Sequence, residues 1–96
     1  MSIEKLNEEF NKELSYGNSE TSDLTSHIRS GIAYLETLVG NKLDFEENVF
    51  ARSILRDYVR YSVNNSTEYF EENFERELVR LQLVEGVKWL ESEQKS

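Results

Sequence analysis

His27 is the only histidine of the chain and the first residue to examine for catalysis. A catalytic histidine needs a nucleophile or an orienting carboxylate nearby. On a helix, Asp23 lies one turn before His27, so its carboxylate could orient the imidazole but could not act as the nucleophile. We therefore expect His27 to lie at the exposed edge of its helix, without a catalytic role.

The carboxylates form neighbouring pairs but no metal-binding pattern. Adjacent residues of a helix point about 100° apart, so neighbouring acids do not converge on one ion. The pairs are Glu8-Glu9, Glu46-Glu47 and Glu71-Glu72. A di-metal bundle would place Glu-x-x-His pairs on facing helices, and the chain has none. It also has no cysteine, no glycine-rich phosphate loop and no nucleophile elbow. We predict no catalytic residues, no metal, no cofactor and no enzymatic activity.

Three arginines form the only basic stripe, since Arg52, Arg56 and Arg60 recur every fourth residue along a predicted helix. Such a stripe could follow a nucleic-acid backbone, but Asp57 lies beside it and the chain as a whole is acidic. Two other interpretations stay open. The arginines pair with acids of the last helix of the same chain, or they pair with acids of a neighbouring subunit. The acids of the last helix concerned are Glu68, Glu72 and Glu75.

Composition limits the partners of the chain. Acidic residues outnumber Lys and Arg by 19 to 11, which gives a net charge of −8. Non-specific binding to nucleic acid and binding to anionic membranes both need clustered basic residues, so we expect neither. No apolar run approaches the roughly 20 residues of a membrane-spanning helix, and the N-terminal stretch lacks the pattern of a signal peptide. The absence of cysteine favours an intracellular origin.

The same composition predicts the fold class. The chain has no proline and four glycines, helix-forming residues dominate, and Val, Ile and Thr do not alternate with polar residues. We predict a single all-α domain over residues 1–96, a small bundle of about four helices with a long C-terminal helix. A short first helix and its loop cover 1–19. The main helices cover 21–40, 46–64 and 67–92, and 91–96 forms a frayed tail.

Apolar residues at helical spacing mark the inward faces of the first three helices. They are Ile3, Leu6, Phe10 and Leu14; Leu24, Ile28, Ile32, Leu35, Leu38 and Val39; and Phe50, Ala51, Ile54, Leu55, Tyr58 and Tyr61. Gly31 lies within the second set, where a missing side chain lets another helix approach closely. Gly40 ends that helix, and Leu43 and Phe45 turn inward to pin the following link.

Cap residues place the starts of these helices. Candidates are Thr21 or Ser22 for the second helix, Asp44 for the third and Ser66 or Thr67 for the last. Asp23 then falls in the first turn of the second helix, near the positive end of its dipole.

The last helix carries two apolar stripes on opposite sides. The first can join the core and consists of Phe70, Phe74, Leu78, Leu81 and Val84. The second consists of Val79, Leu83, Val87 and Leu90, with Trp89 nearby. Either the first and third helices enclose the last one and bury both stripes, or the second stripe docks on another protein. Tryptophan is a frequent anchor of protein interfaces, and Gly86 could break the helix and turn its end outward.

Residues 51–87 resemble the small head–tail connector (adaptor) proteins of long-tailed bacteriophages. Similar members carry a helix ending in a Tyr-Val-Arg-Tyr-like run, then Asn-Asn, then Phe-Glu-Glu-Asn-Phe. Here these are Tyr58-Val59-Arg60-Tyr61, Asn64-Asn65 and Phe70-Glu71-Glu72-Asn73-Phe74. Residues 23–40 are also similar to the family's helix that ends in glycine before a loop, so the resemblance covers residues 23–90. The first helix departs from the family, because many members have a longer acidic loop after it.

This resemblance implies a structural virion protein without catalytic activity. Such adaptors form a ring, typically dodecameric, beneath the portal protein, and they extend the DNA channel towards the next connector or tail protein. DNA passes through without specific binding, and the protein belongs to the neck of a virion assembled in the host cytoplasm. The family's C-terminal region tends to embrace the portal. In this chain that region contains the predicted docking residues Val79, Leu83, Val87, Trp89 and Leu90. The contacts between subunits would use Arg52, Arg56, Arg60, Glu68, Glu72 and Glu75.

A second hypothesis comes from the charge alone. A small acidic phage-encoded binding module could act as an inhibitor that mimics DNA and blocks a DNA-binding protein. Such a module needs acids along one continuous face, whereas the acids of this chain are scattered over several predicted helices.

Overall fold

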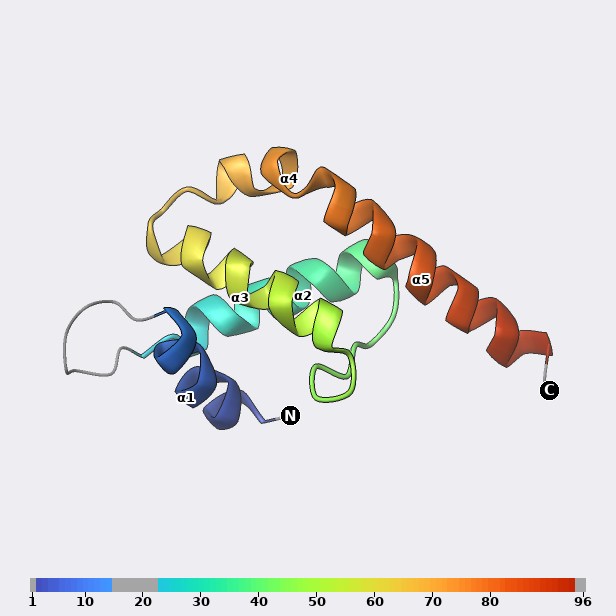
Figure 1. Ribbon diagram of the computed structural model, residues 1–96, viewed down its shortest axis with the longest axis horizontal. Coiled ribbons are helices and arrows are strands. Elements are labelled where there is room, and N and C mark those ends of the chain that lie inside the picture. The colour runs from blue at the N-terminus through green and yellow to red at the C-terminus, as the bar shows by residue number, and fades with distance from the viewer. Residues whose placement is uncertain (1, 15–22, 95–96) are drawn as a thin grey trace.

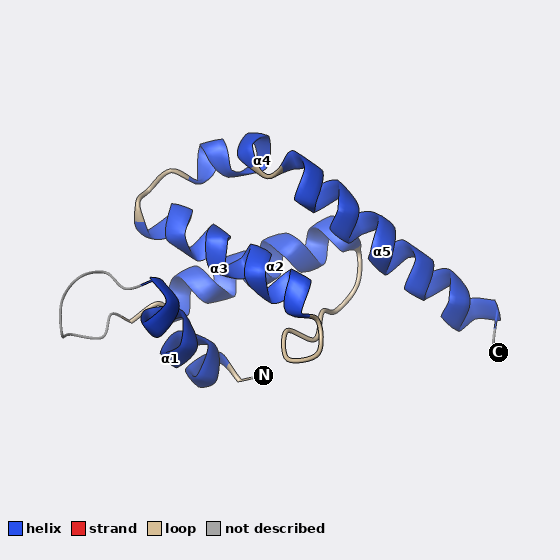
Figure 2. Cartoon of the chain, viewed as in Figure 1, coloured by secondary structure: helices blue, strands red, loops and turns tan. Residues whose placement is uncertain are grey.

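Two helices of 15 residues, α2 (Thr25–Val39) and α3 (Val49–Val63), form the centre of the protein (Figure 1). The computed structural model describes residues 2–14 and 23–94, and the side chains at 89 and 92–94 lie outside that description. Every regular element in this part of the chain is a helix (Figure 2). The all-α class predicted from composition is therefore confirmed.

Gly31 allows α2 and α3 to pack closely. A Cβ atom at this position would lie 2.5 Å from Cδ1 of Leu55 and 2.9 Å from Cδ1 of Tyr58. Real side chains do not approach so closely, so hydrogen is the only substituent that fits here without rearrangement. The close approach expected at Gly31 is confirmed, and α3 is the helix that makes it.

The helix α1 (Ile3–Leu14) packs on α2 and buries Leu6 and Phe10. The amide N–H of Leu24 donates to Oδ1 of Asn7 at 2.8 Å, which ties the start of α2 to α1. The predicted loop after the first helix and the predicted caps Thr21 and Ser22 lie outside the described residues.

The boundaries of α2 agree with the sequence at one end only. Asp23 does not lie in the first turn, because α2 begins at Thr25; its carboxylate accepts a hydrogen bond from the Thr25 amide at 3.0 Å. At the other end, Gly40 adopts φ 74° and its N–H donates to the Glu36 carbonyl. This is the left-handed terminus that glycine favours.

The third helix begins later than predicted. Oδ1 of Asp44 accepts hydrogen bonds from the amides of Glu46 and Glu47, but these residues form an isolated turn. Asn48 caps α3 instead, and its side chain accepts from the Ala51 amide at 2.9 Å. Phe45 is buried within the link, as predicted. The turn that brings Phe45 into the core delays the helix by three residues relative to the prediction of 46.

The predicted single helix over 67–92 is wrong. The chain instead forms a 3-10 turn η1 (Thr67–Tyr69), a short helix α4 (Phe70–Asn73) and a 20-residue helix α5 (Glu75–Gln94). Phe74 breaks the helix with φ −116° and ψ 21°. The ring of Phe74 stacks on the ring of Phe70 with 4.8 Å between their centres, and both rings contact the ring of Tyr61. This aromatic packing is favoured over a continuous helix. The tail expected to fray from 91 is helical as far as Gln94, and Gly86 does not break α5.

The core is built from the predicted apolar faces with two exceptions. Val59 is fully buried although the predicted arc omitted it, and Val84, predicted to be buried, is 41% exposed. The buried apolar side chains are Leu6, Phe10, Leu24, Ile28, Leu35, Phe45, Ala51, Ile54, Leu55, Val59, Phe70, Leu78 and Leu81.

Replacing Gly31 by alanine tests the α2–α3 contact. Leu55 is fully buried and would have to move to admit the added methyl group, so we expect Gly31→Ala to lower the free energy of unfolding by about 1–3 kcal/mol. Gly86→Ala is the matched control, because nothing lies within 4 Å of its added methyl group; it should raise that free energy by up to about 1 kcal/mol. Chemical denaturation measures both, and an equal gain for both variants would contradict the close packing.

Candidate docking surface on the last helix

The helix α5 is held to the rest of the protein along one face. Leu78 and Leu81 are buried in the core. Gln82 lies one turn after Leu78, and its side-chain amide donates to the Leu38 carbonyl at 3.1 Å. The side-chain amide of Asn48 donates to the buried carboxylate of Glu85 at 3.2 Å. These contacts span less than half of the helix.

The opposite face of α5 is apolar and exposed. Four residues, each about one turn after the last, form an apolar stripe on this face, and each is 47% to 65% exposed. They are Val79, Leu83, Val87 and Leu90. The alternative in which the first and third helices enclose this stripe does not hold, because α5 packs against α2, α3 and α4 and leaves the stripe uncovered. Its far end projects beyond the other helices (Figure 1). The side chain of Trp89 lies outside the described part of the chain.

Two arginines flank the first half of this stripe. Val79 and Leu83 lie in one surface patch of α5 together with Glu75, Arg76 and Arg80. The guanidinium of Arg80 lies 5.5 Å from the ring centre of Phe50, which holds it near α3. Arg76 is exposed and forms no ion pair within the described residues. Apolar side chains beside a cationic group suit a protein partner with an apolar groove and an acidic edge.

Two of the three arginines of α3 pair with acids of α1. Arg52 Nε lies 3.9 Å from the Glu9 carboxylate, and Arg56 Nη1 lies 3.2 Å from the Glu13 carboxylate. Arg60 pairs with Asp57 at 3.5 Å. These contacts correct the expectation that the three arginines pair with the last helix of their own chain.

The acids expected to meet those arginines remain at the surface. Glu68, Glu72 and Glu75 are exposed and form no ion pair with the residues that the structure describes. The sequence pattern identified two charged faces but not their partners, because Glu9 and Glu13 lie more than forty residues from the arginines.

Asp57 lies between the arginines in a partly buried position. Burial raises its pKa above the ordinary value, while Arg56 and Arg60 oppose this shift and Glu77 adds to it. Removing either arginine would therefore raise the pKa of Asp57 further.

His27 is half-buried and joins α2 to α3. Its Nδ1 lies 2.6 Å from Oγ of Ser62, a contact that the sequence analysis did not identify. The Asp23 carboxylate accepts hydrogen bonds from Thr25 and not from the His27 ring, so it does not orient that ring. The hydrogen bonds from Thr25 lower the pKa of Asp23. A histidine and a serine alone do not complete a nucleophilic site. We assign the His27–Ser62 pair a structural role.

The described part of the chain contains no candidate metal site. No three of its His, Asp or Glu side chains are grouped as metal ligands would be. None of the described helices combines the length and apolar character needed to cross a bilayer. Comparisons with protein-family models, with curated proteins and with solved structures find no match for this chain. Fold and site together define an all-α protein that presents an uncovered apolar helix face.

The exposed stripe should be dispensable for folding. Because Leu83 is 65% exposed, Leu83→Asp should change the free energy of unfolding by less than about 1 kcal/mol. Leu81→Ala, two positions earlier on the buried face, should lower it by about 2–5 kcal/mol. Thermal and chemical denaturation followed by circular dichroism measure both. Similar losses for the two variants would place Leu83 in the core.

Reversing Arg56 should loosen α1. Arg56→Glu puts a carboxylate beside Glu13 and Asp57, so the free energy of unfolding should fall by about 1 kcal/mol. Amide hydrogen exchange should quicken in α1. Arg29→Glu makes the same charge change at an exposed site with no ion pair in the described chain and should have little effect. Equal effects of both variants would refute an α1-specific role.

Proposed function

We propose that this protein is a structural component of a phage virion, an adaptor that forms a ring between the portal and the next connector or tail protein. The ring extends the channel through which DNA passes. The observation that supports this proposal is the uncovered stripe of α5, Val79, Leu83, Val87 and Leu90. The resemblance of residues 51–87 to head–tail adaptors supplies the partner.

The stripe has the form of a helix that docks in a groove. Apolar anchors one turn apart on one face are the usual pattern of this binding mode. Burying a valine or leucine side chain contributes about 1.5–3 kcal/mol relative to leaving it exposed. A small domain with several such side chains in water therefore gains stability when another protein covers them. We propose that the portal covers the far end of α5, at Val87 and Leu90.

The arrangement of the helices and the net charge of the chain fit the same role. We propose that α1, α2, α3 and the segment around α4 form a small bundle, and that α5 is the long C-terminal arm which reaches the portal. The net charge of −8 suits the wall of a channel in which DNA must slide without binding.

The contacts between subunits need a change from the first expectation. Arg52 and Arg56 are engaged by α1 of the same chain, which makes them poor candidates for a neighbour. The exposed acids Glu68, Glu72 and Glu75 keep their proposed role, and they need cations from elsewhere on the adjacent subunit.

The DNA-mimic inhibitor has less support. A mimic needs acids along one continuous face. Glu68, Glu72 and Glu75 are exposed, but Glu9 and Glu13 are paired with Arg52 and Arg56, which removes two of the acids that such a face would need. No observation on the described residues favours this alternative over the adaptor.

Binding to the portal tests the proposal. Val87→Asp should weaken co-sedimentation with portal particles of the same phage by at least about tenfold, because a charge would have to enter an apolar contact. Val63→Asp is the matched control: Val63 is 37% exposed and lies at the last residue of α3, at the opposite end from Asn48 and Phe50, which contact α5. Failure of the unaltered protein to bind these particles, or equal binding by both variants, would overturn the proposed function.

A further inference from the structure

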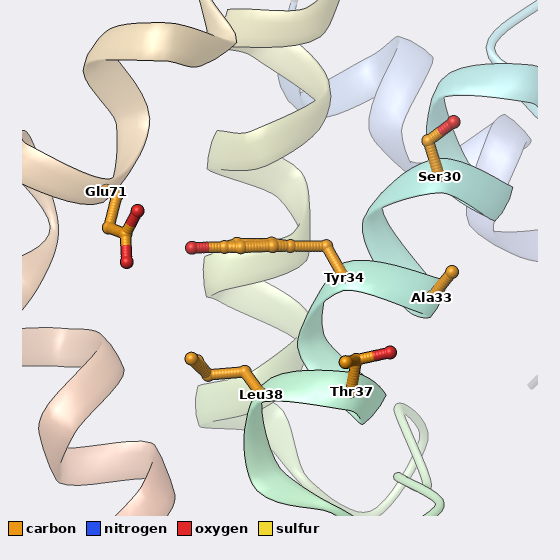
Figure 3. A pocket seen from close by; sticks show the side chains of 6 residues that line it. All are labelled: Ser30, Ala33, Tyr34, Thr37, Leu38 and Glu71. Atoms are coloured by element: carbon orange, nitrogen blue, oxygen red, sulfur yellow. The ribbon is translucent and has the colours of Figure 1, made fainter.

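A groove runs between α2 and α4 on a surface that the proposed portal contact does not use. It has a volume of about 510 Å³ and is lined by Ser30, Ala33, Tyr34, Thr37, Leu38 and Glu71. Figure 3 shows Tyr34 and Leu38 extending from α2 towards the opposite side, where Glu71 lies. Ser30, Ala33 and Thr37 are small, so a helix could approach α2 closely there.

The chemistry of this groove is apolar with an acidic edge. Burial raises the pKa of Tyr34 above its ordinary value, and the negative charge of Glu71 raises it further. Glu71 is exposed and forms no ion pair within the described chain. An occupant that fits would present a narrow apolar ridge with a cationic group beside it.

The first half of the exposed face of α5 has this chemistry. Val79 and Leu83 form an apolar ridge, and Arg76 lies on the same side of the helix, one turn before Arg80. Arg52 and Arg56 are occupied by α1, which leaves Arg76 as a cation available to a neighbour.

The α5 helix of the same chain cannot fill the groove. Leu78 and Leu81 are buried on its inner face, and this attachment turns Val79 and Leu83 away from the core. A second copy of the chain has no such restriction. The ridge and the groove share no residue. If each subunit offers its ridge to one neighbour and its groove to the other, the contact is heterologous, the kind that closes rings.

We infer that the ridge of α5 in one subunit packs into the α2–α4 groove of the next, with Arg76 beside Glu71. This inference rests on the proposed ring and specifies its subunit contact. It assigns Arg76, Val79 and Leu83 to the neighbouring subunit, and it leaves Val87 and Leu90 to the portal.

Cysteine cross-linking tests the contact, because the chain has no cysteine of its own. Ala33→Cys and Leu83→Cys, both at exposed positions, are treated with a short bismaleimide, separately and as an equal mixture. We expect cross-linked dimers in the mixture and almost none with either variant alone. A chain carrying both cysteines should give a ladder of oligomers. The treatment is done on concentrated protein and on protein bound to portal particles.

The controls separate this contact from chance collisions and from the proposed function. Lys5→Cys mixed with Ala33→Cys should give no product, since Lys5 is exposed on α1, outside the ridge. Equal products from single and mixed variants, or no mixed product either in solution or on the portal, would overturn the inference. Mixed product without any portal binding would support the subunit contact and contradict the adaptor role.

Charge exchange tests the pairing of Arg76 with Glu71. Arg76→Glu and Glu71→Arg should each lower the yield of mixed product by about tenfold, because each brings two like charges together. The chain with both changes should recover most of that yield. Lys5→Glu, an exposed change on α1, should have no effect. Loss in both single variants without recovery in the double variant would overturn this pairing.

Discussion

The structure depends on the close packing of α2 against α3. Gly31 makes this contact possible, because a side chain there would collide with Leu55 and Tyr58. The pair then supports the remaining elements: α1 covers one side, and the ring of Phe70 packs against Tyr58 at 5.2 Å. Phe70 in turn fixes where α5 can begin. The close packing that Gly31 permits therefore supports the surface on which the last helix lies.

The attachment of α5 has a functional consequence. The two central helices are short, so they cover only the first half of a 20-residue helix and only one of its faces. No other element among the described residues covers the opposite face. The apolar stripe is thus exposed in the single chain, and we propose that another protein or another copy buries it. Assembly then adds stability to a domain that buries a modest share of its own surface.

Patterns local in the sequence predicted much of this arrangement. Helical spacing identifies the buried faces and the second stripe of α5, and Gly40 marks the end of α2. The errors arose where distant residues decide the local structure. Phe74 breaks the last helix because its ring packs with rings of other segments. His27 and Ser62 meet although 35 residues separate them, and no spacing rule connects Arg56 with Glu13.

The most direct test of surplus apolar surface on α5 is an electron-microscopy reconstruction of the neck of a tailed particle that carries this chain. We predict a ring of copies beneath the portal, with Val87 and Leu90 covered by portal residues and Leu83 covered by the adjacent copy. A neck in which these side chains face solvent, or one that lacks the chain altogether, would contradict the claim that assembly completes the fold.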